Sequence, residues 1–186
     1  MKSNFVQGAL WAAIVFSIPL ISDGSFLVAQ EPAQGLPGAQ HEALHALAGS
    51  WEVYVDSQLA GSATATLRLD GRFLEVEINA DAGPMQNIIY TFGFDRRNDV
   101  YTVIAMDDSG TYWVTGNGIR DGGRIPMYGK DKDPVMESMG FEKEFAIVLT
   151  IESPGRFEIE ILFIDTRTPE RREISFLTFD LRRVSG

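Results

Sequence analysis

Residues 63–78 read ATATLRLDGRFLEVEI, and this stretch predicts a β-hairpin with one apolar face. Apolar and polar residues alternate on both sides of Asp70-Gly71, a pair typical of a tight turn between antiparallel strands. With a two-residue turn Leu69 pairs with Arg72. The apolar pairs are then Leu67–Leu74, Ala65–Val76 and Ala63–Ile78, and the polar pairs are Thr66–Glu75 and Thr64–Glu77. A shift of the register by a single residue would destroy this match.

The same alternation continues through the rest of the chain. Turn residues recur between runs that are rich in Val, Ile, Thr, Phe and Tyr, as in all-β sandwiches and barrels. The predicted strands are residues 50–57, 62–69, 72–80, 86–95, 99–107, 111–118, 124–129, 143–152, 155–165 and 173–183. No helical pattern separates them, which excludes a parallel α/β sheet. We therefore predict an all-β fold, an antiparallel up-and-down barrel of about ten strands.

The residues before the first predicted strand divide into three segments. In residues 1–29, Lys2 precedes an apolar run from Ala9 to Ile21, and a more polar stretch ends at Ala29, which is the arrangement of a secretory signal peptide. A retained membrane anchor is the alternative, but the run is short for a membrane span and contains a proline. Residues 30–40 (QEPAQGLPGAQ) predict a flexible linker, and residues 41–186 predict the barrel domain. We expect a secreted or periplasmic protein without stable membrane insertion after removal of the signal peptide.

Composition excludes several kinds of partner and site. The net charge of −10 opposes binding to a phosphate backbone, so we expect no nucleic-acid partner. The chain has no cysteine, which excludes disulfides, thiolate metal sites and a cysteine nucleophile. Gly116-x-Gly118 precedes no predicted helix and is not a nucleotide-binding motif. We expect no cofactor.

Residues 41–48 (HEALHALA) predict a short helix that Gly49 ends, and Gly49-Ser50-Trp51 opens the first strand. This combination resembles the start of the lipocalin group, in which the Trp plugs one end of the barrel and an Arg of the last strand lies across it. Trp51 is the matching Trp, and Arg182 and Arg183 end the last predicted strand. Alternation places Arg183 on the same face as Leu177, Phe179 and Leu181, so Arg183 is the expected partner in a cation–π contact that closes the barrel.

Over most of its length the chain also resembles the lipocalin-like family catalogued as domain of unknown function 1579. The matching pieces are His41-Glu42-x-Leu44, Leu47 to Trp51, Gly71 to Leu74, Phe92 to Asp95 and Asp108 to Thr111. The resemblance implies a barrel with a short capping helix at its N-terminal end. It implies no activity, because a fold by itself does not supply one.

His41-Glu42-Ala43-Leu44-His45 fits the H-E-x-x-H pattern of zinc hydrolases, in which two histidines bind the metal and the glutamate acts as general base. A catalytic zinc needs a third protein ligand, and the chain has no other histidine. The predicted helix is also short and follows a linker. A zinc-dependent hydrolase that uses His41, Glu42 and His45 is therefore an alternative, and we expect neither a metal site nor a catalytic residue.

Aromatic residues gather on the fourth, fifth and sixth predicted strands. We expect Tyr90, Phe92, Tyr101, Tyr112 and Trp113 to line a site for a small apolar or aromatic ligand, with tyrosine hydroxyls as polar contacts. The alternative is that these side chains only fill the barrel, which would then have a structural or interaction role. The sequence predicts a ligand-binding barrel of unknown role rather than an enzyme.

Overall fold

The structure is a computed structural model, and it describes residues 38–82, 85–108, 113–131, 143–166 and 169–184. One helix, α1 (Ala39–His45), precedes ten strands in this part of the chain. The strands are β1 (Gly49–Val55), β2 (Gln58–Arg68), β3 (Phe73–Ala82), β4 (Met85–Asp95), β5 (Val100–Asp107), β6 (Trp113–Gly118), β7 (Arg124–Asp131), β8 (Lys143–Ser153), β9 (Arg156–Asp165) and β10 (Arg172–Arg183). None of the helical residues described forms a segment long and apolar enough to cross a membrane.

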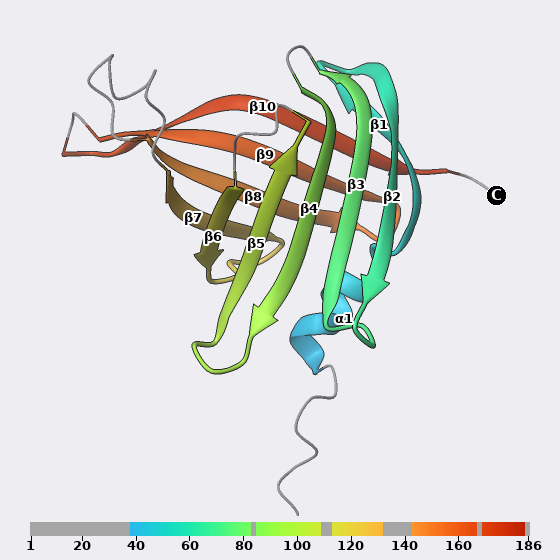
Figure 1. Ribbon diagram of the computed structural model, residues 1–186, viewed down its shortest axis with the longest axis horizontal. Helices are drawn as coiled ribbons and strands as arrows, with labels where there is room; N and C mark the ends of the chain where they lie inside the picture. Colours follow the sequence, from blue (N-terminus) through green and yellow to red (C-terminus); the bar gives the residue numbers. More distant parts are fainter. Residues whose placement is uncertain (1–37, 83–84, 109–112, 132–142, 167–168, 185–186) are drawn as a thin grey trace, which may run out of the picture. The chain divides into compact units, whose positions relative to one another are not determined.

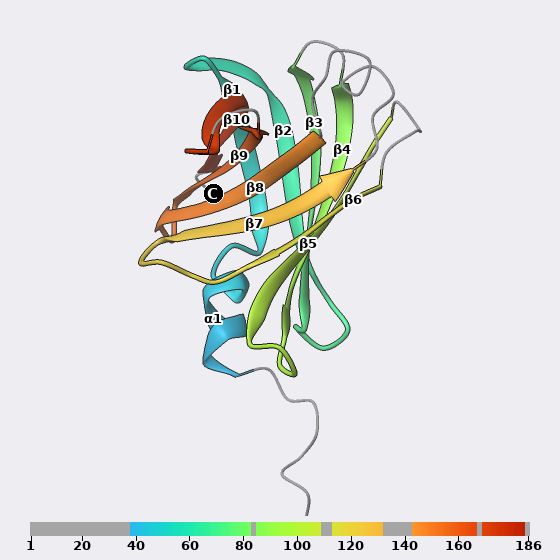
Figure 2. The ribbon, with the colours of Figure 1, turned by 90° about the vertical axis from the view of Figure 1, so that its left-hand side faces the viewer.

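The ten strands form one closed antiparallel barrel, which confirms the predicted fold class. Each strand pairs with its neighbour in sequence, and β1 pairs with β10 to close the ring. Figures 1 and 2 show α1 at one end of the barrel, beside the turn between β2 and β3. Such an up-and-down barrel leaves no free sheet edge.

The hairpin of β2 and β3 has the predicted register. Five of the six predicted pairs are present, from Leu67–Leu74 to Ala63–Ile78, and the pair Leu69–Arg72 next to the turn is not. The predicted turn was too tight: pairing ends at Arg68–Phe73, and Leu69, Asp70 and Gly71 all have left-handed backbone, with φ of 48°, 56° and 79°. The wider turn places the carbonyl oxygen of Gly71 2.6 Å from Nε2 of His45 in α1.

The helix is shifted from the predicted range. It begins at Ala39 because the backbone N–H of Gly38 donates to Nδ1 of His41, which caps the first turn. It ends at His45, before Gly49, because the next residues tighten into a turn of the 3₁₀ type. The N–H groups of Leu47 and Ala48 donate to the carbonyls of Leu44 and His45.

The barrel core consists of the apolar residues that alternate inward on each strand. Phe157 and Ile159 of β9 are fully buried on the inner face. Strands β8 and β9 are apolar on both faces, and Ala146, Val148, Leu162 and Ile164 form a second buried cluster. Glu144, beside this cluster, is buried and pairs with Lys130 and Arg171. Such pairing offsets the cost of removing its carboxylate from water.

The backbones of β6 and β7 lie very close together where the two strands meet. In the described part of these two strands the residue pair is Asn117–Tyr128. A Cβ added at Gly118 would lie 1.7 Å from the carbonyl oxygen of Pro126, and one at Gly116 would lie 2.8 Å from that of Met127. The two glycines therefore allow the backbone of β7 to cross close to β6.

We expect Gly118→Ala to destabilise the protein by about 2–3 kcal/mol, because the added methyl group must push the backbone of β7 away. Gly155→Ala is the matched control, since a Cβ there would be 3.9 Å from its nearest neighbour, the Ser153 Oγ. The control should change the free energy of unfolding by less than about 0.5 kcal/mol. Urea unfolding followed by circular dichroism measures both, and equal effects would contradict the close crossing.

Candidate functional site

The end of the barrel that carries α1 is closed around Trp51. The indole is fully buried, its Nε1 donates to the carbonyl of Leu47 at 3.0 Å, and its ring meets Phe157 edge to face at 4.6 Å. Burying an aromatic side chain of this size removes a large apolar area from water, and the hydrogen bond satisfies its one polar atom. Trp51 thus joins the first strand to the end of α1.

Arg183 lies over the same indole. Its guanidinium carbon is 4.3 Å from the ring centroid, and its nitrogens donate to the carbonyls of Ala46 (2.7 Å), Ala48 (3.0 Å) and Pro154 (2.9 Å). Carbonyls at the end of a helix lack partners within it and carry partial negative charge, so a cation there is stabilising. Arg182 points to the other face, where it lies over Tyr54 and bonds to Asp180.

The two histidines of the H-E-x-x-H motif make contacts within the protein. His45 Nε2 bonds to the Gly71 carbonyl at 2.6 Å, and the Nδ1 of His41 accepts from the N–H of Gly38 at 3.2 Å. Burial, and next the nearby His45, hold the pKa of His41 below its ordinary value, so the ring stays neutral and keeps this acceptor. In the described part of the chain no three His, Asp or Glu side chains come close enough to hold a metal ion.

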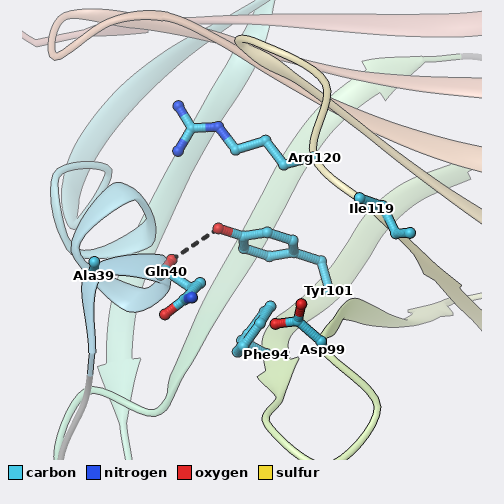
Figure 3. A pocket seen from close by; sticks show the side chains of 7 residues that line it. All are labelled: Ala39, Gln40, Phe94, Asp99, Tyr101, Ile119 and Arg120. Carbon is cyan, nitrogen blue, oxygen red and sulfur yellow. Dashed lines mark hydrogen bonds between the residues drawn. The ribbon is translucent and has the colours of Figure 1, made fainter.

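A hollow of about 320 Å³ opens beside the start of α1. Figure 3 shows the ring of Tyr101 in its centre, with its hydroxyl donating to the Gln40 carbonyl at 3.1 Å and with Phe94 and Arg120 on opposite sides. The residues that line it are Ala39, Gln40, Phe94, Asp99, Tyr101, Ile119 and Arg120. Tyr101 packs edge to face on Phe94 at 5.0 Å, so both rings hold the helix start against the barrel.

Tyr90 lies inside the barrel. Only 1% of its surface is exposed, and its ring stacks on Phe92 with centroids 5.9 Å apart and planes 17° apart. Its neighbours in the register, Val76 on β3 and Ala105 on β5, are small. The next strand places Ala65 opposite Val76. Small side chains therefore lie beside Tyr90 across the strands, and Phe92 packs against its ring.

The hydroxyl of Tyr90 is buried and has no hydrogen-bond partner within the described structure. A buried hydroxyl without a partner costs about 1–3 kcal/mol, which is why such groups are rare. Burial, and then the charge of Asp107, raise the pKa of Tyr90 well above its ordinary value. The phenol therefore stays protonated and keeps its O–H as a donor.

The structure places the predicted ligand-site residues in two regions. Tyr90 and Phe92 lie together in the core, whereas Tyr101 reaches α1 and lines the hollow there. Trp113 begins β6 opposite Met106, and its side chain lies outside the described part, as does all of Tyr112. Sequence reasoning did not connect Asp107 with Tyr90 or Arg120 with the hollow, because nothing in their local pattern shows which face or turn brings them there.

We expect Arg183→Gln to lower the free energy of unfolding by about 1–3 kcal/mol, because three backbone carbonyls lose charged hydrogen-bond donors. Arg182→Gln is the matched control and should lower it much less, since its ion pair lies on the outer face. Denaturant unfolding of both variants, each also combined with Trp51→Phe, measures the coupling to the indole. Equal effects of the two arginines would rule out a special role of Arg183.

A comparison with protein families relates the chain to known sequences. The model of a family described as "Protein of unknown function (DUF1579)" matches residues 36–183. The match covers the helix and all ten strands, so the resemblance found in the sequence is confirmed. No curated protein matches the chain.

Proposed function

We propose that this chain, which belongs to the DUF1579 family, binds a small apolar ligand inside its barrel. The observation that carries the proposal is the Tyr90 hydroxyl, which is fully buried and has no hydrogen-bond partner among the described residues. A fold that only had to fill its core would do so at lower free energy with a phenylalanine at this position. A ligand that accepts a hydrogen bond would remove the cost.

The walls around Tyr90 support an internal site. The inward residues beside it are small, and ten strands enclose more space than the eight of a barrel that side chains just fill. The α1 end is closed by Trp51 and Arg183, which bind the end of the helix. A ligand would therefore enter from the end opposite α1.

The alternative of a zinc-dependent hydrolase receives no support from the geometry. His45 uses Nε2 on a backbone carbonyl, and His41 is buried against Phe94 at a ring distance of 6.0 Å. Among the described residues, no third His, Asp or Glu joins them in a group that could hold a metal ion. The histidines instead attach α1 to the barrel. A purely structural barrel remains the competing role, and it leaves the cost of the Tyr90 hydroxyl unexplained.

The proposal includes export of the protein. Lys2 and the apolar run from Ala9 to Ile21 have the composition of a secretory signal peptide. The chain has no cysteine, so its folding would be unaffected by the redox conditions of the compartment. A binding protein in that location would act on ligands taken from the surroundings of the cell.

Native mass spectrometry of the protein purified from its host is expected to show a mass added to the folded protein. The addition should disappear on denaturation and should have the size of a small organic molecule. Protein refolded from denaturant without ligand is the control. A folded protein that carries no added mass from any growth condition would favour the structural barrel.

Protein purified from the exported fraction is expected to begin between Ser25 and Glu31, because the signal peptidase would cut after the small residues near Ala29. Sequencing of the N-terminus measures this directly. Replacing Val15 by Arg interrupts the apolar run and should leave uncut precursor in the cell. An intact terminus at Met1 or Lys2 on membrane-bound wild-type protein would contradict export as a soluble form.

A further inference from the structure

We infer that the hollow beside α1 is a second binding site, which takes a small zwitterion with an ammonium and a carboxylate at opposite ends of a flat apolar body. This inference goes beyond the proposed function and does not rest on it, because the hollow shares no lining residue with the described surroundings of Tyr90. It follows from three features of the hollow: two charges without partners, a fixed position for each charge and an apolar surface between them.

The first feature is a pair of opposite charges, Asp99 and Arg120, which both line the hollow. Apart from the bond of the Arg120 Nε to the Gly122 carbonyl at 2.6 Å, neither side chain has a hydrogen bond or an ion pair among the described residues. In Figure 3 the Asp99 carboxylate lies on the Phe94 side of the Tyr101 ring, and the Arg120 guanidinium lies on the other side. The hollow therefore offers a partner for a cation at one end and for an anion at the other.

The turn between β4 and β5 leaves the Asp99 carboxylate available. Asp95 stabilises this turn, since it accepts from the side-chain amide of Asn98 at 2.6 Å and from the backbone N–H of Arg97 at 2.9 Å. Asp99 has left-handed backbone, with φ of 56°, and its carboxylate takes no part in these bonds. Of the two carboxylates in the turn, only that of Asp99 lines the hollow.

The position of Arg120 is fixed by the turn that follows β6. Asp121 and Arg124 exchange two backbone hydrogen bonds, at 2.7 and 2.9 Å, around Gly122-Gly123, a pair typical of a tight hairpin turn. The Gly122 carbonyl is therefore held in place, and its bond to Nε directs the guanidinium of Arg120. The two terminal nitrogens stay available as a fork for a carboxylate, and less side-chain freedom is lost when one binds.

The third feature is the apolar surface between the two charges. Tyr101 is buried, and its hydroxyl already donates to the Gln40 carbonyl, so the phenol has no need of a polar group from a ligand. Phe94 is half-buried and Ile119 is 71% exposed, and both line the hollow beside the Tyr101 ring. Flat rings pack well on such a surface, and a volume of about 320 Å³ suits a small molecule.

Three probes of the same size test the inference by NMR titration of isotope-labelled protein at neutral pH. They are 4-(aminomethyl)benzoate, which is the zwitterion, 4-methylbenzoate, which lacks the cation, and 4-methylbenzylamine, which lacks the anion. The zwitterion should bind about 2- to 5-fold more tightly than either singly charged probe, the range expected for one exposed ion pair. The amide signals of Gln40, Tyr101 and Ile119 should shift, because these residues line the hollow. A fourth probe, trans-4-(aminomethyl)cyclohexanecarboxylate, has the same charges on a ring that is not flat and should bind more weakly than the aromatic zwitterion.

Two variants remove one charge each. Arg120→Gln should abolish the preference for the zwitterion over 4-methylbenzylamine, and Asp99→Asn should abolish its preference over 4-methylbenzoate. Asparagine tolerates the left-handed backbone at position 99, so the turn should persist. Arg97→Gln and Asp56→Asn are the matched controls, because neither residue lines the hollow and Asp56 also has left-handed backbone, with φ of 49°. Both controls should keep the order of the probes.

Several results would overturn the inference: no binding of the zwitterion, equal affinity for the three aromatic probes, equal affinity for the flat and the saturated zwitterion, or signal changes only away from the hollow. Equal effects of a variant and its control would do the same. The order of the probes on the wild type decides even if a variant fails to fold. A protein that carries a ligand from its host but does not bind the zwitterion would contradict this inference alone and leave the proposed function intact.

Discussion

The pairing of β1 with β10 is the constraint on which the rest of the structure depends. It sets Trp51 opposite Arg183 in the register, so the ring closes where the largest buried side chain meets a cation. The guanidinium of Arg183 donates hydrogen bonds to the carbonyls of Ala46 and Ala48, and the indole of Trp51 donates one to the carbonyl of Leu47. One contact therefore closes the sheet, ends the helix and seals one end of the barrel.

Because side chains close one end of the barrel, the two ends of its interior differ. At the α1 end the polar side-chain atoms of Trp51 and Tyr101 both have hydrogen-bond partners. Farther along β4, Tyr90 has none in the described structure, although it is equally buried. A satisfied and an unsatisfied buried group thus lie within one core, and this contrast distinguishes the closed end of the barrel from the region where we propose that a ligand binds.

The alternation of residues was enough to predict the strands, their antiparallel order and the register of the β2–β3 hairpin, because β2 and β3 each have one apolar face and one face exposed to water. The helix limits were missed because they depend on the cap between Gly38 and His41 and on a 3₁₀ turn after His45. The turn at Gly71 was missed because its carbonyl contacts His45, which is 26 positions away in the sequence. The periodicity of the sequence placed Tyr90 on a strand, but it could not show that the Tyr90 hydroxyl lacks a hydrogen-bond partner among the described residues. Such an absence is a property of the whole core.

The closing contact joins residues that are 135 positions apart, Ala48 and Arg183, while every other strand pair is local in sequence. Local hairpins form within about microseconds, but the ring can close only after the last strand has been made. A chain that ends before β10 would expose Trp51 and two open sheet edges, on β1 and β9, and such edges recruit other chains. Truncation near the C-terminus therefore favours aggregation. For the same reason the growing chain has to stay apart from its copies until β10, with Arg183, has been synthesised.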